Sequence, residues 1–162
     1  MGKGGCKSPL FYIVNIEEEI KESAFRSPYQ RVVVNLLFTA NWMQGKLLAF
    51  FKSYDITPQQ FNILRILRGQ YPNKISGVEI KARMLDKNSD IPRLLYRLIK
   101  KGYIQKTQCP NDRRAGEISI TEKGLELLAQ VDKPLHQMER EIVGLSEEEA
   151  NTLSKLLDKL RS

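Results

Sequence analysis

Residues 88–124 constrain the fold of this chain more than any other stretch, and they read NSDIPRLLYRLIKKGYIQKTQCPNDRRAGEISITEKG. In the first part, apolar residues recur at helical spacing, at Ile91, Leu94, Leu95, Leu98 and Ile99. Gly102 predicts the end of that helix. The segments YIQKTQ and EISI alternate as strands do, and CPNDRRAG between them is rich in turn-forming residues. The stretch therefore predicts a helix over 89–101, a β-hairpin and, from Thr121, a new helix.

Capping signals predict where the other helices begin. Ser27-Pro28 and Thr57-Pro58 each place a cap residue before a proline, which suits the first position of a helix. Capping boxes are predicted for the pairs Asn15–Glu18, Thr57–Gln60, Ser76–Glu79 and Ser146–Glu149. The helix that begins at Pro28 and runs to about Tyr54 is apolar on more than one face. It therefore needs more than one neighbour, and a second subunit is a natural source of one.

Two short helices, a tight turn, a third helix and a hairpin make a winged helix-turn-helix. The predicted fold class is mainly α with a small β-hairpin wing (α+β), and the N- and C-terminal helices are expected to serve dimerisation. We expect an N-terminal arm and short helix over 1–27 and a dimerisation helix over 28–55. The winged helix-turn-helix DNA-binding domain is expected over 56–121, and C-terminal dimerisation helices over 122–162.

The net charge of +7 is concentrated in one part of the chain. Between Arg65 and Arg114 there are 13 Lys and Arg against 4 Asp and Glu, whereas residues 141–162 hold 5 acidic against 3 basic side chains. A single basic segment of this kind indicates a surface that faces a polyanion. The alternative is a basic face that only meets solvent.

Double-stranded DNA is the polyanion that the helix over 89–101 and the hairpin fit best. The side of the helix opposite its apolar stripe, with the residue before it, carries the candidate major-groove residues Asn88, Ser89, Pro92, Arg93, Tyr96, Arg97 and Lys100. Asp90 is expected to serve the helix N-terminus or to accept from a cytosine amino group. Arg113 and Arg114 at the hairpin tip suit a narrow minor groove, with Asp112 orienting a neighbouring arginine. The competing interpretation of the hairpin is an exposed turn with a local ion pair of little energetic value.

At these residues the chain resembles the MarR family of bacterial transcription regulators. The segment DRRAGEISITEKG is similar to that family's D-x-R…(L/I)-T-x-x-G signature, and the likeness extends over about residues 28–162. The resemblance implies a winged-helix homodimer over a palindrome, with Arg114 in the minor groove, Asp112 bracing the wing, and Ser89, Pro92, Arg93 and Tyr96 near the major groove. Two residues depart from the family pattern. Many relatives have Thr or Ser at the position of Pro92, and many have a basic residue at the position of Glu117.

The leading hypothesis is a sequence-specific, homodimeric repressor that binds a palindromic operator. The resemblance implies that a small-molecule effector releases it from the operator. The residues that bind this effector are unassigned. A winged-helix protein–protein interaction module and a thiol-based redox sensor using Cys6 or Cys109 are the alternatives. No catalytic residues, cofactor or metal are expected, because no nucleophile–base pair, phosphate loop or Cys/His cluster is present in the sequence. Apolar runs too short for a membrane and only two cysteines favour a cytoplasmic protein.

Overall fold

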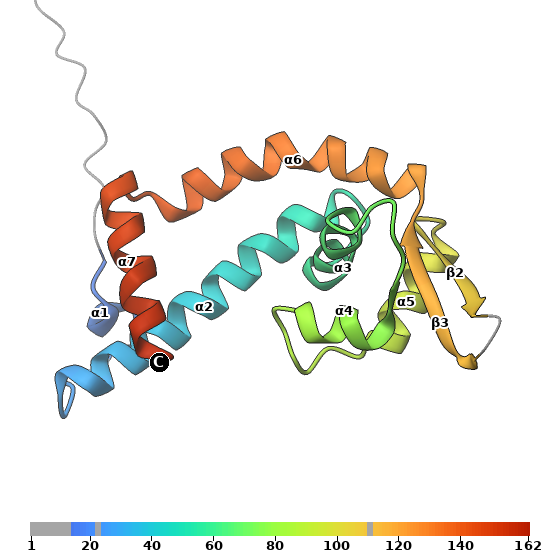
Figure 1. Cartoon of the computed structure of the whole chain (residues 1–162). Helices are drawn as coiled ribbons and strands as arrows, with labels where there is room; N and C mark the ends of the chain where they lie inside the picture. The colour runs from blue at the N-terminus through green and yellow to red at the C-terminus, as the bar shows by residue number, and fades with distance from the viewer. Residues whose placement is uncertain (1–13, 22–23, 110–111) are drawn as a thin grey trace, which may run out of the picture. The chain divides into compact units, whose positions relative to one another are not determined.

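The computed structural model describes residues 14–21, 24–109 and 112–162 and is mainly helical with one small sheet (Figure 1). The helices are α1 (Ile16–Ile20), α2 (Pro28–Lys52), α3 (Pro58–Arg68), α4 (Gly77–Arg83), α5 (Ile91–Lys100), α6 (Glu122–Val143) and α7 (Glu147–Leu160). The strands are β1 (Ile75–Ser76), β2 (Ile104–Cys109) and β3 (Asp112–Ile120). The predicted fold class, a mainly α chain with a small β wing, is confirmed.

The chain divides into two compact units, Met1–Gln44 and Gly45–Ser162, with the division inside α2. The second unit contains every element from α3 to α7, including the sheet. Among the described residues, no helix combines the length and apolar content needed to cross a bilayer.

Side-chain caps start most of the helices at the predicted positions. Thr57 and Gln60 form a reciprocal box at α3, with bonds of 3.0 and 3.2 Å between each side chain and the other's backbone N–H. Ser76–Glu79 at α4 and Ser146–Glu149 at α7 make the same box. The hydrogen bonds that Ser76 donates to the carboxylate of Glu79 lower the pKa of that group.

The capping box predicted at Asn15 is wrong. The Asn15 side chain makes no cap hydrogen bond, and its backbone carbonyl accepts from the N–H groups of Glu18 and Glu19 at 3.0 and 3.2 Å. Helix α1 ends after five residues, at Ile20, where Lys21 adopts a left-handed conformation with φ 54°.

The sheet is antiparallel with the order β1-β3-β2. Ile104 of β2 lies opposite Ile120 of β3, and Ile75 of β1 lies opposite Ile118. All four isoleucines are buried in the core of the second unit. Strand β1 was not predicted, because two residues are too few to show the period of a strand.

The predicted extent of the wing loop is wrong. The sequence predicts a loop over the whole of CPNDRRAG, residues 109–116, whereas β2 continues to Cys109 and β3 begins at Asp112. Only residues 110–111 lie between the strands. Cross-strand pairing of Gln108 with Gly116 extends the ladder past residues of low strand propensity, and a register shift follows between Gln108 and Cys109.

The core of the second unit holds α5 and the sheet in place. Leu64 of α3, Leu98 of α5 and Leu128 of α6 are all fully buried in one cluster. Arg68 at the end of α3 donates two hydrogen bonds to the Asp132 carboxylate of α6, at 2.6 and 3.1 Å. Helix α5 therefore shares one core with α3, α4, α6 and the three strands.

Candidate nucleic-acid interface

Helix α5 has one buried side and one exposed side. Leu98 on the inner side is 0% exposed, whereas Tyr96 is 67% exposed. Arg93, Tyr96 and Lys100 follow one another at intervals of three and four residues, so they share one face of the helix. We call these three residues the outward stripe. Ser89 lies just ahead of the helix, before its N-cap Asp90. Arg93 and Lys100 are exposed and Ser89 is half-buried.

The turn before α5 is held by two carboxylates. The carboxylate of Asp86 accepts from the Asn88 N–H at 2.9 Å and from the Ser89 hydroxyl at 3.1 Å. The backbone carbonyl of Asp86 also accepts from the Ser89 N–H, at 3.3 Å. Asp90 is the N-cap of α5, and its side chain accepts from the Arg93 N–H at 3.1 Å. The expected role of Asp90 at the helix N-terminus is therefore confirmed.

Two further residues shape this end of the helix. Pro92 is exposed and stands in the first turn of α5, where its missing N–H costs no helical hydrogen bond. Lys87 turns back toward α4, and its ammonium group donates to the carbonyl of Ala82 at 2.6 Å. The positive charge of Lys87 thus lies at the end of α4 rather than in the outward stripe.

The C-terminal end of α5 is tied to the turn that joins α2 to α3. The Lys101 ammonium lies 2.8 Å from the Asp55 carboxylate and also donates to the Asp55 backbone carbonyl. Asp55 has a positive φ of 54°, which is uncommon for a residue other than glycine. Lys123 of α6 donates to the Lys101 carbonyl at 2.8 Å. These bonds fix how α5 ends.

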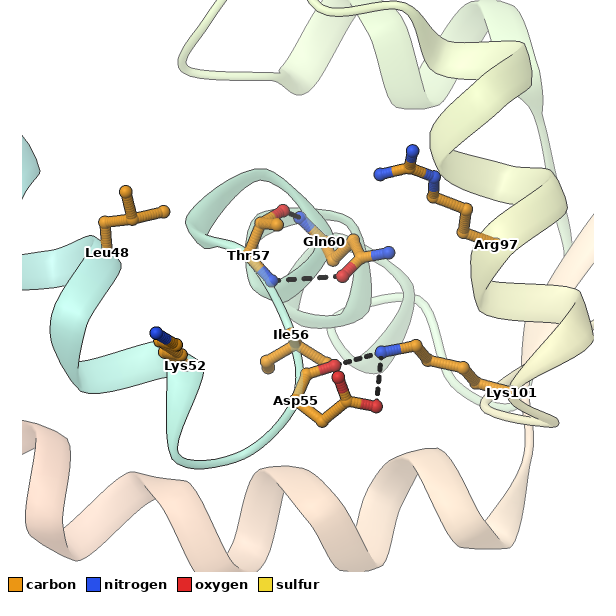
Figure 2. Close-up of a pocket in the computed structure, with 8 residues that line it drawn as sticks. All are labelled: Leu48, Lys52, Asp55, Ile56, Thr57, Gln60, Arg97 and Lys101. Atoms are coloured by element: carbon orange, nitrogen blue, oxygen red, sulfur yellow. Dashed lines mark hydrogen bonds and ion pairs between the residues drawn. The ribbon is translucent and has the colours of Figure 1, made fainter.

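A cavity of about 550 Å³ opens beside this end of α5, and Figure 2 shows the side chains around it. It is lined by Leu48, Lys52, Asp55, Ile56, Thr57, Gln60, Arg97 and Lys101. Three of these residues are cationic and one is anionic. The Gln60 side chain is buried, and in Figure 2 its amide nitrogen points toward the side of the cavity where Arg97 lies. The lining combines positive charge with the apolar side chains of Leu48 and Ile56, a combination that an anion with an apolar body would match.

The candidate wing residues are only partly described. The backbone of Asp112, Arg113 and Arg114 belongs to β3, but the side chains of residues 108–115 lie outside the described part of the chain. Cys6 lies outside the described residues altogether. At the base of the wing, Lys74 donates to the Thr107 hydroxyl at 3.1 Å. The Lys106 side chain lies across the open face of Gly116, where an added Cβ would meet its Cε at 1.9 Å.

The structure thus places Arg93, Tyr96 and Lys100 on one face of α5, with Ser89 just ahead of its N-cap, and gives Arg97 a second setting, on the wall of the cavity. Sequence reasoning missed Asp86, which holds the turn, and Lys101, which anchors the helix end. The spacing Asp-x-Asn-Ser could have revealed the first, because Asp side chains often bond the backbone two residues on. Among the described residues, no three His, Cys, Asp or Glu side chains are grouped as metal ligands.

Comparison with known proteins adds an independent line of evidence. The sequence model described as the MarR family matches residues 56–115, from the start of α3 into the wing. The transcriptional repressor MprA of Escherichia coli is 30% identical over 155 residues, which cover 91% of this chain and 87% of MprA.

Solved structures agree with that match. A putative MarR-like transcription regulator from Bacillus cereus aligns with a TM-score of 0.73 and 26% identity, over 82% of this chain and 95% of its own. A mutant MarR from Escherichia coli, complexed with operator DNA, aligns with a TM-score of 0.68 and 25% identity, over 91% and 99% of the two chains.

Proposed function

Because the chain belongs to the MarR family of transcriptional regulators, we propose that it is a homodimeric repressor that binds a palindromic operator and leaves it when a small-molecule effector binds. Regulation of transcription through DNA binding is the activity that the family shares. The dimer, the direction of regulation and the release by an effector are the proposed refinements.

The observation that carries the DNA-binding part is the outward stripe of α5 beside the β2–β3 wing. Arg93 and Lys100 on this stripe are exposed cations, and the core beneath leaves them free to enter a major groove. The proposed contacts from α5 and the turn before it are Asn88, Ser89, Pro92, Arg93, Tyr96, Arg97 and Lys100. For the wing, we propose that Arg113 and Arg114 enter the minor groove and that Asp112 braces them.

The homodimer is supported by apolar side chains that the described chain leaves exposed. Leu37 of α2 is 61% exposed, and Leu156 of α7 is 60% exposed. Leu153 and Leu160, also on α7, are exposed as well. Exposed apolar residues repeated along a helix indicate a surface for another chain. We therefore propose 28–55 and 122–162 as the dimerising segments, 56–121 as the reading domain and 1–27 as an arm, in a cytoplasmic protein.

The repressor assignment rests on likeness to MprA, which is named a transcriptional repressor. The effector assignment is supported by the cavity of about 550 Å³ in Figure 2, whose lining includes Lys52, Arg97 and Lys101. An effector that draws Arg97 into the cavity removes a cation from the DNA-facing side of α5. Binding of effector and DNA would then oppose each other.

Fluorescence anisotropy tests the proposal. The full chain is titrated onto a labelled duplex from just upstream of its own coding region and onto a scrambled duplex, across a salt series. We expect tight binding to the upstream duplex with a large preference that survives moderate salt. Equal, weak and steeply salt-dependent binding to both duplexes would contradict sequence-specific binding at this site.

A variant of the wing separates a DNA-binding regulator from a module that binds another protein. Arg114→Ala is expected to weaken binding to the upstream duplex, because an arginine in the minor groove gains from its negative potential. Unchanged DNA affinity in Arg114→Ala would instead favour a winged-helix module that binds another protein.

A further inference from the structure

We propose that Ser89 reads an amino group on the edge of one operator base, and that Asp86 is the positioning residue that commits it to do so. This inference rests on the proposed function, because it takes α5 to be the helix that enters the major groove. It adds a specificity determinant to that function.

The position of Ser89 next to α5 is the first step. Ser89 comes directly before Asp90, the N-cap of α5, and is half-buried. Its side chain is short, and Pro92 in the first turn of the helix has no side-chain donor. If the N-terminal end of α5 enters the major groove, the hydroxyl of Ser89 is a compact polar group beside the bases.

The hydrogen bond to Asp86 is the second step. The Ser89 hydroxyl donates to one carboxylate oxygen of Asp86 at 3.1 Å, while the other oxygen accepts from the Asn88 N–H at 2.9 Å. An ionised carboxylate only accepts hydrogen bonds, so the single hydroxyl hydrogen of Ser89 lies on this bond. The remaining capacity of the Ser89 oxygen is that of an acceptor.

The acceptor character decides what Ser89 can contact. Phosphate oxygens are acceptors and give Ser89 no hydrogen. In the major groove, the base-edge donors are the amino groups of adenine and cytosine, whereas guanine and thymine present acceptors at the corresponding positions. Ser89 therefore favours adenine or cytosine on the strand that it faces. The neighbouring carboxylates of Asp86 and Asp90 also disfavour a phosphate at this end of the helix, while Arg93 and Lys100 supply attraction farther along it.

Selection from a random DNA pool tests this with the full-length chain and the variants Ser89→Ala and Asp86→Asn. Wild type is expected to enrich a palindromic motif with adenine or cytosine at one position of each half-site. Ser89→Ala should lose about fivefold of that preference, as for one hydrogen bond of ordinary net strength. All other positions of the motif should stay unchanged.

The Asp86→Asn variant tests the positioning role. Its amide oxygen can still accept from the Asn88 N–H, but its amide nitrogen can donate to Ser89 and release the hydroxyl hydrogen. The preference at the same position should then shift toward guanine or thymine, a change that mere loosening of the turn would not produce. Glu126→Gln, which removes an exposed carboxylate from α6, is the charge-matched control and should leave the motif unchanged.

The outcomes separate this inference from the proposed function. A motif enriched by wild type and left identical in both variants would overturn the inference and leave the proposed function standing. Uniform weakening of all sequences by Ser89→Ala would identify a phosphate contact and overturn it as well. A loss of preference in Ser89→Ala without any change in Asp86→Asn would remove the role of Asp86. Failure of wild type to enrich any motif would overturn the proposed function and this inference with it.

Discussion

Gly124 lies so close to the strand that precedes α6 that only a hydrogen atom fits on its inner side. A Cβ there would stand 2.3 Å from the Tyr103 carbonyl oxygen and 2.7 Å from Cγ1 of Ile120. The Thr121 hydroxyl accepts from the Gly124 N–H at 3.2 Å and donates to the Gly102 carbonyl at 2.7 Å. The segment TEKG thus joins the wing to α6 in two ways. The Thr121 hydroxyl bonds both Gly102 and Gly124, and the backbone of Gly124 lies close to Tyr103 and Ile120.

Gly124→Ala is predicted to destabilise the chain by roughly 1–3 kcal/mol, because backbone and a buried isoleucine must move to admit the methyl group. Urea denaturation followed by circular dichroism measures the loss. Gly77→Ala is the matched control, because its Cβ would meet only Leu95 and Ile118 carbons at 3.8 and 3.9 Å. Equal stability of the two variants would show that the approach at Gly124 is not tight in solution.

Lys100 belongs to the outward stripe and has no part in the core, and we propose that its charge serves DNA binding. Lys100→Ala is predicted to weaken binding to all duplexes by a similar factor and to reduce the slope of log K against log salt by about 1. Anisotropy titrations across a salt series measure that slope. Lys133→Ala, an exposed lysine of α6, serves as control and should leave it unchanged. An unaltered slope in Lys100→Ala would remove this residue from the interface.

At the scale of elements, the cap of α4 makes part of the stability depend on pH. Hydrogen bonds from Ser76 hold the pKa of the Glu79 carboxyl below its ordinary value. A carboxyl whose pKa is lowered on folding stabilises the fold above its unfolded pKa, about 4.3, and loses that contribution as the pH falls through the folded pKa. The stabilising contribution of Glu79 should therefore decline as the pH falls below about 4.3.

Glu79→Gln isolates this effect, because glutamine can accept the same hydrogen bonds without titrating. Wild type is predicted to be the more stable of the two near neutral pH, and the difference should shrink as the pH falls below the ordinary range of a glutamate. Urea midpoints of both proteins from neutral to acidic pH give the comparison. A difference that stays constant over that range would contradict a titrating role for Glu79.

The elements that could be predicted from the sequence are those whose ends are marked by residues close together in the chain. Thr57, Ser76 and Ser146 mark helix starts because each cap acts within four residues. The pairing of Ile75 with Ile118 is invisible to such signals, since it joins residues far apart in the chain. The same long-range pairing extends β2 and β3 beyond the predicted strands. Asn15 misled the prediction because its carbonyl already satisfied the N–H groups that a side chain would have capped.

In the candidate site, too, local features could be predicted from the sequence and long-range ones could not. The exposed face of α5 follows from helical spacing, so the sequence predicted Arg93, Tyr96 and Lys100 together. The cavity in Figure 2 is built by Leu48, Gln60 and Lys101, from three elements, and only the fold brings them to one place. Asp86 was missed because the Asp-x-Asn-Ser spacing, in which its carboxylate accepts from Asn88 and Ser89, was not considered as a turn signal.

At the scale of the whole molecule, the described residues form a well-filled core in the second unit, while apolar side chains along some of the described helices stay exposed. The core of the second unit draws residues from α3, α4, α5, α6 and the sheet. On α7, by contrast, the described chain buries no residue fully, although Leu153, Leu156 and Leu160 repeat at intervals of three and four. A helix with an uncovered apolar stripe gains stability when a second copy covers it.

Leu156→Glu is therefore predicted to convert the proposed dimer into monomers without unfolding the chain. Leu156 is 60% exposed in the single chain, so the substitution costs little there, but a two-fold interface would bury the new charge twice. We expect the dimer to dissociate at least about a hundredfold more readily, or roughly 3 kcal/mol. Sedimentation equilibrium measures this, with Lys155→Glu as the neighbouring charge control. A Leu156→Glu protein that sediments like wild type would place the interface elsewhere.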